Sequence, residues 1–141
     1  MTHKFNYGLM KAINGGKQMT DVWRLPAVRR WEKSCGKHPT QKPLRLLTRL
    51  VLASTDKGDW VFDPFCGSGT TGIAANLCGR RFAGIEQERE YCELSRARRA
   101  ELESLEAQAY LIKHIEDLQL AKEFGFASEA EPLYGGMPFD K

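Results

Sequence analysis

The segment GDWVFDPFCGSGTTGIAANLCGRRFAGIE, residues 58–86, decides the fold of the chain. Its apolar run at 60–62 follows a Gly-Asp turn pair, and a run of this kind between turn residues is typical of a buried parallel strand. Residues 66–72, CGSGTTG, form a glycine-rich turn, which leads into a helical stretch at 73–77. A second apolar run, at 82–85, predicts another strand. The order strand–loop–helix–strand indicates an α/β fold.

An acidic residue stands at the end of each predicted strand, Asp63 after the first and Glu86 after the second. Glycines let backbone N–H groups approach a ligand closely, and a carboxylate 23 residues after Asp63 suits the two hydroxyls of a ribose. The spacing therefore predicts a nucleoside-containing cofactor at the carboxyl ends of the strands. It leaves the cofactor's identity open. The letters of 67–72 also match the dinucleotide pattern G-x-G-x-x-G, and a glycine-rich turn without a ligand is the alternative.

A second motif lies upstream of the first strand. Residues 37–43, KHPTQKP, precede an apolar helix that leads into DPFCGSGTT at 63–71. This order resembles the S-adenosylmethionine-dependent DNA amino-methyltransferases, which act on adenine N6 or cytosine N4, in their circularly permuted arrangement. The resemblance covers about residues 20–100 and implies a Rossmann-like class I methyltransferase fold, incomplete here, of which this chain is the cofactor-binding part. It also argues against a nicotinamide-binding fragment, the rival enzyme hypothesis.

The resemblance implies roles for individual residues. S-adenosylmethionine would be the cofactor, with the loop at 67–69 around its methionine end, Asp63 facing its ammonium group and Glu86 taking its ribose hydroxyls. His38 and Thr40 would supply hydrogen bonds from the loop above the methionine end. The hydroxyls of the two threonines after the glycine loop could serve either as helix caps or as ligands. The predicted cofactor-binding residues are His38, Thr40, Asp63, Phe65, Gly67, Ser68, Gly69, Thr70, Thr71 and Glu86.

The chain lacks the motif with which the resembling family holds its target. Family members use an [Asp/Asn/Ser]-Pro-Pro-[Tyr/Phe/Trp] tetrapeptide, whose ring stacks on a flipped base. None of the six prolines follows another, and EPLY at 131–134 has the wrong first residue and a single proline. We therefore expect no catalytic residue in this chain. In the permuted order the tetrapeptide would lie before Met1, so we expect a carboxyl-terminal portion with a missing or separate amino-terminal half.

The motifs that are present and the motif that is missing lead to one functional hypothesis and its alternatives. The hypothesis is a site-specific DNA methyltransferase, with adenine N6 favoured over cytosine N4, whose isolated 141-residue chain is inactive. The alternative is an inactive remnant or subunit that binds cofactor or DNA without catalysis. An RNA or protein substrate is a further alternative.

Basic residues concentrate near the start of the chain. Residues 1–50 carry eleven Lys or Arg against two acidic residues, although the whole chain has a net charge of only +3. Tryptophans stand among these basic residues, a pattern that can follow a nucleic-acid backbone. Double-stranded DNA is therefore the predicted partner, and a solvated basic surface with packing tryptophans is the alternative. The candidate DNA-binding residues are Arg24, Arg29, Arg30 and Lys33.

Leucines at helical spacing predict a helix at 44–51 that packs on the sheet. A second apolar stripe, which includes Tyr91, Leu94, Leu102 and Leu105, predicts a long helix over about 87–122, also packed on the sheet. The stripe drifts along the chain, so a helix with a break is the alternative. We divide the chain into the end of a target-recognition or linker region at 1–37, the cofactor-binding part at 38–122 and an irregular tail at 123–141.

The cysteine spacing and the hydrophobic pattern indicate the cellular location of the protein and its partners. The four cysteines show no C-x-x-C spacing, which indicates reduced thiols rather than a disulfide framework or a zinc site. No stretch approaches the roughly 20 apolar residues that span a bilayer. We therefore expect a cytoplasmic protein with neither a metal nor a membrane partner.

Overall fold

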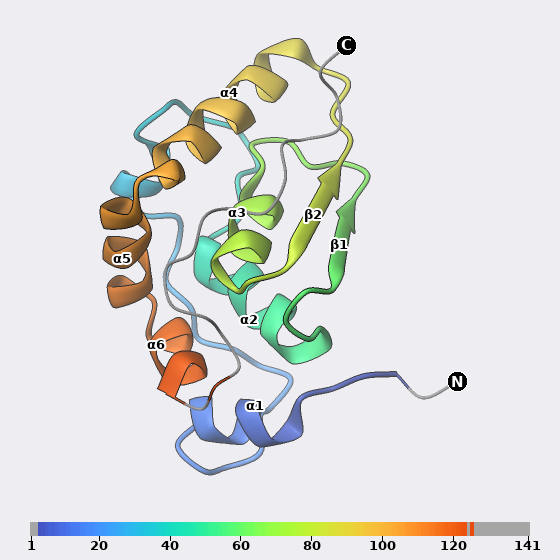
Figure 1. Ribbon diagram of the computed structural model, residues 1–141, viewed down its shortest axis with the longest axis vertical. Helices are drawn as coiled ribbons and strands as arrows, with labels where there is room; N and C mark the ends of the chain where they lie inside the picture. Colours follow the sequence, from blue (N-terminus) through green and yellow to red (C-terminus); the bar gives the residue numbers. More distant parts are fainter. Residues whose placement is uncertain (1–2, 124, 126–141) are drawn as a thin grey trace.

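The computed structural model describes residues 3–123 and residue 125. Most of the described chain is helical, and two short strands lie beside the helices (Figure 1). In chain order the elements are α1 (Tyr7–Ile13), the 3₁₀ helix η1 (Arg30–Lys33), α2 (Leu44–Ser54), β1 (Trp60–Asp63), α3 (Thr70–Leu77), β2 (Arg81–Gly84), α4 (Arg89–Ala100), the 3₁₀ helix η2 (Glu101–Glu103), α5 (Leu105–His114) and α6 (Glu116–Glu123).

The two strands form a parallel pair joined by α3, which confirms the predicted strand–loop–helix–strand unit. The register runs from Trp60 opposite Arg81 to Asp63 opposite Gly84. Helix α3 packs against both strands, and α2 packs against α3 from the other side. Because both strands run the same way, their carboxyl ends meet at one edge of the pair. The glycine-rich loop that joins β1 to α3 begins at this edge.

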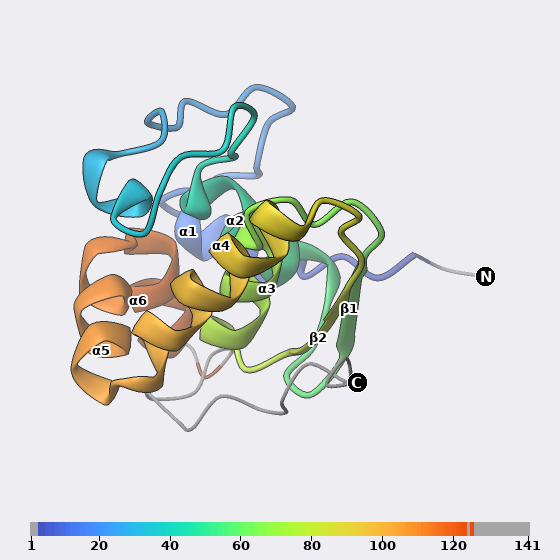
Figure 2. The ribbon, with the colours of Figure 1, turned by 90° about the horizontal axis from the view of Figure 1, so that it is seen from above.

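The prediction that the first strand is buried is wrong for alternate residues. Trp60 is 62% exposed and Phe62 is 61% exposed, whereas Val61 and Asp63 are partly buried. Helix α3 covers only one face of the pair, and Figure 2 shows both strands along one side of the molecule. The Arg81 guanidinium lies 5.8 Å from the ring centroid of Trp60 on the exposed face. Within the described residues, this apolar sheet face therefore meets solvent.

A hydrophobic core joins the start of the chain to its last helices. The amino-terminal helix α1 contributes Leu9 and Met10, each 1% exposed, although the first 37 residues show no clear period in the sequence. The Asn6 side chain donates to the carbonyl oxygens of Leu52 and Thr55 at 2.7 and 2.9 Å. These bonds fix the start of α1 against the end of α2. The sequence analysis missed α1.

Helix α2 begins directly after Pro43 as predicted, but it packs on α3, α6 and α1 rather than on the sheet. Arg49 donates from Nε and Nη2 to the two oxygens of buried Asp117, at 2.8 and 3.0 Å. Its guanidinium also lies 5.3 Å from the ring centroid of Trp23. A buried ion pair of this kind needs such bidentate geometry to offset its desolvation. It ties α2, α6 and the loop around Trp23 together.

The long helix expected over about 87–122 is broken into α4, η2, α5 and α6, which is the alternative that the drifting stripe left open. Ser104 ends the first part and caps α5, since its side-chain oxygen accepts from the Ala107 N–H at 3.4 Å. Helix α6 packs on α1, α2 and α5 rather than on the sheet, and Leu105 of the predicted stripe is 54% exposed. Of the tail predicted at 123–141, only Glu123, which ends α6, and Gly125 are described. None of the described helices is both long and apolar enough to cross a membrane.

Candidate cofactor site

A pocket of about 130 Å³ opens at the carboxyl end of β1. It lies between the KHPTQKP segment and the glycine-rich loop, so the fold brings the two sequence motifs together. Eight of the ten predicted cofactor residues line it, whereas Gly69 and Glu86 do not. The lining residues are His38, Thr40, Gln41, Lys42, Leu47, Asp63, Phe65, Cys66, Gly67, Ser68, Thr70 and Thr71.

Two glycines let the loop pass through left-handed backbone conformations close to its neighbours. Gly67 has φ +51°, and a Cβ at this position would lie 3.1 Å from Nε2 of His38. Gly69 has φ +74°, and a Cβ there would lie 2.1 Å from Oγ of Ser95 in α4. Residues other than glycine adopt such φ values only at a cost, and these positions also leave no space for a side chain.

Asp63 at the end of β1 is held in place from both sides. Its Oδ1 accepts from the Phe65 N–H at 3.0 Å, and its Oδ2 accepts from the Thr71 hydroxyl at 2.6 Å. Gly69 occupies the N-cap position of α3, and no side chain caps this helix. Thr71 therefore does not cap the helix and donates to Asp63 instead, while a ligand role of the threonines stays a prediction. A carboxylate fixed in this way is preorganised to meet a cation.

Glu86 ties the end of β2 to the glycine loop. Its Oε2 accepts from the Gly67 N–H at 2.9 Å, and its Oε1 accepts from the Glu88 N–H at 2.9 Å. A carboxylate has about four lone-pair sites, so both oxygens can still accept from a ligand hydroxyl. Glu86 thus stands two residues beyond Gly84, the last residue of β2, whereas Asp63 is itself the last residue of β1.

His38 lies over the loop, held by its own segment and by α4. The Thr40 N–H donates to Nδ1 of His38 at 3.2 Å, and Lys42 donates from Nζ to the Thr40 carbonyl at 3.1 Å. The His38 ring also packs against the ring of Tyr91 at an interplanar angle of 58°, with ring centroids 4.1 Å apart. The sequence analysis assigned Tyr91 to an apolar packing stripe and missed this contact.

Helix α4 supplies a second residue that sequence reasoning missed. Arg98 is 6% exposed and donates from Nη1 to the Ser68 carbonyl at 2.6 Å and to the Thr70 hydroxyl at 2.9 Å. Burial lowers the pKa of the Arg98 guanidinium, and the Glu32 carboxylate opposes this effect. The spacing of Arg98, seven residues after Tyr91, is the only signal in the sequence, since it places both on one face of a helix.

The pocket lining contains one acidic residue, Asp63, and one basic residue, Lys42. Burial raises the pKa of the Cys66 thiol to about 11, and the carboxylates of Asp63 and Glu86 add to this effect. Cys66 is therefore a neutral thiol at pH 7 and forms part of the wall, because only the thiolate is a nucleophile. The carboxylates of Asp63 and Glu86 give the strand side of the site a negative charge, which favours a ligand that carries positive charge there, whereas the ammonium group of Lys42 belongs to the KHPTQKP segment.

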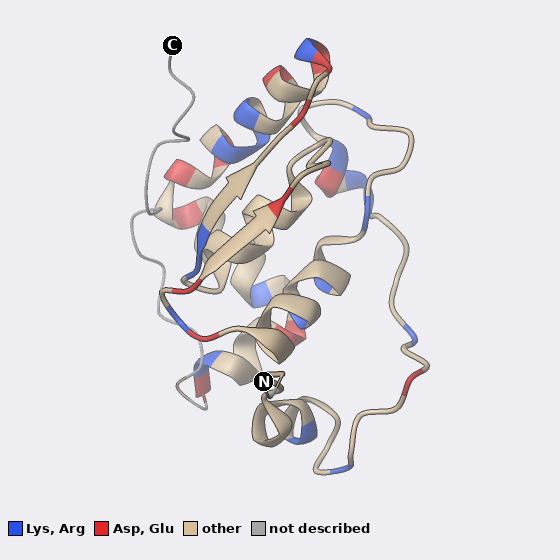
Figure 3. Cartoon of the chain, turned by 90° about the vertical axis from the view of Figure 1, so that its right-hand side faces the viewer, with Lys and Arg blue, Asp and Glu red and all other residues tan. Residues whose placement is uncertain are grey.

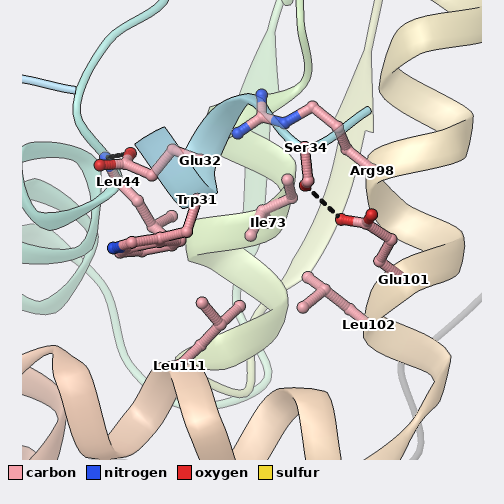
Figure 4. A pocket seen from close by; sticks show the side chains of 9 residues that line it. All are labelled: Trp31, Glu32, Ser34, Leu44, Ile73, Arg98, Glu101, Leu102 and Leu111. Carbon is pink, nitrogen blue, oxygen red and sulfur yellow. Dashed lines mark hydrogen bonds between the residues drawn. The ribbon is translucent and has the colours of Figure 1, made fainter. Parts of the chain in front are cut away.

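A smaller pocket of about 50 Å³ lies behind the loop, between η1, α3, α4 and α5. Figure 4 shows Arg98 entering it from α4, with Leu111 on its far side. Within it, the Ser34 hydroxyl donates to Glu101 at 3.0 Å. Its remaining lining is largely apolar, and it contains none of the predicted cofactor residues. We interpret this pocket as a gap in the packing of the helices behind the glycine loop.

The candidate DNA-binding residues lie away from the pocket. Arg24, Arg29, Arg30 and Lys33 are all exposed, and Figure 3 shows Lys and Arg recurring along the segment that carries them. Glu32 anchors this segment, because its buried carboxylate accepts from the N–H groups of Arg29 and Leu44 at 2.9 and 2.8 Å.

The described residues contain no cluster of three or more His, Cys, Asp or Glu side chains that could hold a metal ion. All four cysteines are free thiols.

The similarity to known proteins covers the part of the chain that contains the pocket. A family model described as DNA methylase matches residues 3–97. The type II methyltransferase M2.MboI of Moraxella bovis is 62% identical over 100 residues, which cover 71% of this chain and 37% of that protein. The type II methyltransferase M2.DpnII of Streptococcus pneumoniae is 56% identical over 96 residues, 68% of this chain and 36% of that protein. This chain thus spans little more than a third of these relatives.

Among solved structures, the M1.HpyAVI–SAM complex is similar, with a TM-score of 0.54 and 36% sequence identity. The match covers 69% of this chain and 44% of that one.

Proposed function

Since residues 3–97 match its family model, the chain belongs to the DNA methylase family, and we propose that it forms the cofactor-binding part of a DNA methyltransferase. The complete enzyme would move a methyl group from S-adenosylmethionine to an amino nitrogen of a DNA base, with adenine N6 favoured over cytosine N4. The names of the relatives and the S-adenosylmethionine in the solved neighbour support this proposal. They do not favour the alternative of an inactive remnant.

The observation that carries the proposal is the pair of fixed carboxylates beside the glycine loop. S-adenosylmethionine carries positive charge on its sulfonium and ammonium groups, whereas NAD carries a negative pyrophosphate that needs free N–H groups at a helix start. Here the Gly67 N–H already donates to Glu86, and the Gly69 N–H donates to the Cys66 carbonyl at 2.8 Å. The two carboxylates beside the loop therefore favour the cationic cofactor over a pyrophosphate.

The residues of the pocket divide between the two ends of the cofactor. We assign Asp63 to the ammonium group, Glu86 to the ribose hydroxyls and the backbone of 67–69 to the methionine end. His38 and Thr40 cover this end from the KHPTQKP loop, and exposed Phe65 forms the rim. Thr70 and Thr71 act through their contacts with Arg98 and Asp63.

S-adenosylmethionine supplies an electrophilic methyl group when it is bound. Direct transfer requires the acceptor nitrogen to be aligned with that group, and no covalent protein nucleophile is needed. The neutral Cys66 thiol is consistent with this chemistry, because it offers no nucleophile that would compete for the methyl group. The contribution of this chain is thus to bind and orient the cofactor.

We propose that a second polypeptide segment, carrying the Pro-Pro-[Tyr/Phe/Trp] motif, completes the site. No such motif occurs in this sequence. The exposed apolar sheet face around Trp60 and Phe62 supports the proposal, because parallel sheets are ordinarily covered on both faces. In this arrangement residues 1–37 would contact the DNA and residues 38–122 would hold the cofactor.

The proposal is tested by methyl transfer to unmethylated double-stranded DNA, with this chain supplied together with a segment that carries the motif. Mass spectrometry of the digested nucleosides separates N6-methyladenine from N4-methylcytosine. We expect N6-methyladenine at a defined sequence. A completed enzyme that methylates neither base would reject the function, and N4-methylcytosine would correct the base.

Replacement of Glu86 by Ala is expected to weaken S-adenosylmethionine binding by about 1.5–3 kcal/mol, the range for hydrogen bonds to a charged group. Calorimetry measures the effect, and circular dichroism checks that the variant is folded. Glu90→Ala is the matched control, because Glu90 is an exposed carboxylate in the first turn of α4. Unchanged affinity in folded Glu86→Ala would remove Glu86 from the site.

Simultaneous replacement of Arg29 and Arg30 by Ala is expected to flatten the salt dependence of DNA binding by the completed enzyme. Each lost phosphate contact should reduce the slope of log K against log salt by about 0.9. S-adenosylmethionine affinity should not change, since both residues lie away from the pocket. The control is the pair Arg96→Ala and Lys113→Ala, two exposed basic residues outside this segment. A salt slope equal to that of the parent would assign Arg29 and Arg30 to ordinary surface.

A further inference from the structure

Helix α4 holds the cofactor loop from behind with three residues on one face. Tyr91, Ser95 and Arg98 follow one another at intervals of four and three residues, which aligns them along the helix. The ring of Tyr91 packs against His38 at a tilt, and Ser95 packs against Gly69 so closely that a Cβ on Gly69 would lie 2.1 Å from the Ser95 hydroxyl. Arg98 bonds to Ser68 and Thr70. Each residue thus contacts the loop or the histidine that covers it.

Arg98 is the member whose position needs an explanation beyond packing. Burying a guanidinium is costly, and the same volume filled by an apolar side chain is often at least as stable. Yet Arg98 is 6% exposed, and a single nitrogen, Nη1, donates to both the Ser68 carbonyl and the Thr70 hydroxyl. These two acceptors stand on either side of Gly69. The two bonds therefore hold the loop on both sides of Gly69, whose left-handed backbone only glycine adopts without cost.

Acidic residues of η1 and η2 act on the charge of Arg98. The carboxylates of Glu32 and Glu101 both act on the guanidinium, and Glu32 is itself held by the N–H groups of Arg29 and Leu44. Leu44 opens the helix that follows the KHPTQKP segment. Arg98 thus bonds directly to the glycine loop, and Glu32 couples its charge to the start of the helix that follows the KHPTQKP segment.

We propose that Arg98 is a positioning residue that holds the loop at 68–70 in its cofactor-binding conformation, while Gly67 is held separately by Glu86. The inference rests on the proposed S-adenosylmethionine site. Because Arg98 acts on Ser68 and Thr70, its effect falls on the methionine end of the cofactor, whereas the ribose depends on Glu86. Arg98 does not touch the cofactor in this account.

The experiment compares two ligands of the full 141-residue chain by calorimetry, S-adenosylmethionine and 5′-methylthioadenosine, which lacks the amino-acid end. In Arg98→Met the affinity for S-adenosylmethionine should fall about tenfold or more, as for a lost hydrogen bond from a charged group. The affinity for 5′-methylthioadenosine should change by less than about twofold, since its own contacts stay intact. Arg98→Lys, which keeps the charge and one donor direction, should recover part of the loss. Arg96→Gln, an exposed arginine of the same helix, is the control and should bind both ligands as the parent does.

The outcomes separate this inference from the proposed function. A parent chain that binds neither ligand would overturn the proposed site together with the inference. A folded Arg98→Met that binds S-adenosylmethionine like the parent, or that loses both ligands equally, would overturn the positioning role alone. If Arg98→Met does not fold, Arg98→Lys decides: a loss confined to S-adenosylmethionine supports the role, and an equal loss of both ligands rejects it.

Discussion

The 141-residue chain, incubated alone with labelled S-adenosylmethionine and unmethylated DNA, is expected to transfer no methyl group above background. Catalysis requires the target amine and the methyl donor to meet in one pocket, and this chain encodes the residues for the donor only. Loss of alignment removes about 7–11 kcal/mol of barrier lowering, which is more than any single contact in the cofactor site supplies. The asparagine, aspartate or serine that would hold the amine has no counterpart beside a Pro-Pro pair in this sequence.

The control for this prediction is the same assay with a segment that carries the Pro-Pro-[Tyr/Phe/Trp] motif, added as a separate chain or by fusion. Transfer should appear in that mixture and not with the segment alone. Sequence-specific transfer by the 141-residue chain without any addition would contradict the account of a divided site.

Replacement of Gly69 by Ala is expected to abolish measurable S-adenosylmethionine binding. The new side chain would have to adopt φ +74° and would place its Cβ 2.1 Å from the Ser95 hydroxyl. Left-handed strain and overpacking together cost about 2–5 kcal/mol, so the loop should leave its position against α4. Movement of Gly69 would also break the bonds that Arg98 makes on both sides of it.

Gly58→Ala separates the two causes. Gly58 also has a positive φ, +85°, but a Cβ there would meet no atom within 4 Å. It should lose about 1–2 kcal/mol of unfolding free energy from strain alone and keep its cofactor affinity. Thermal unfolding and calorimetry of both variants measure the difference. Equal cofactor affinity in Gly69→Ala and Gly58→Ala would show that the contact between the loop and α4 does not matter.

The sequence predicts the central unit because its signals are local. The apolar runs at 60–62 and 82–85, the glycines between them and the terminal acids each reflect the conformation of their own residues. The meeting of the KHPTQKP and glycine-loop motifs in one pocket followed from the family resemblance, and the structure places them together.

The features that sequence analysis missed depend on partners far away in the chain. Helix α1 has only seven residues, too few for a period to appear, and it is stabilised by Asn6 and by packing of Leu9 and Met10 in the core. The exposure of Trp60 and Phe62 depends on what covers the sheet, which the alternation of two residues cannot reveal. Arg98 looked like one of several surface charges, because only its bonds to a loop 30 residues earlier distinguish it.

The break between the carboxyl-terminal helices was only partly predictable from the sequence. The apolar stripe over 87–122 drifts, and a drifting stripe is compatible with either one curved helix or several short ones. Ser104 is a residue that favours N-caps, and its hydroxyl accepts from the Ala107 N–H in the structure. A capping signal within a helical pattern could therefore have predicted the break.

The central claim is that the carboxylates of Asp63 and Glu86, with the glycine loop between their strands, form a site for S-adenosylmethionine. Calorimetric titration of the 141-residue chain with S-adenosylmethionine and with NAD, in the same buffer, tests it most directly. We predict saturable binding of S-adenosylmethionine at one site and no detectable heat from NAD. Binding of NAD in preference to S-adenosylmethionine, or binding of neither by the folded chain, would contradict the account.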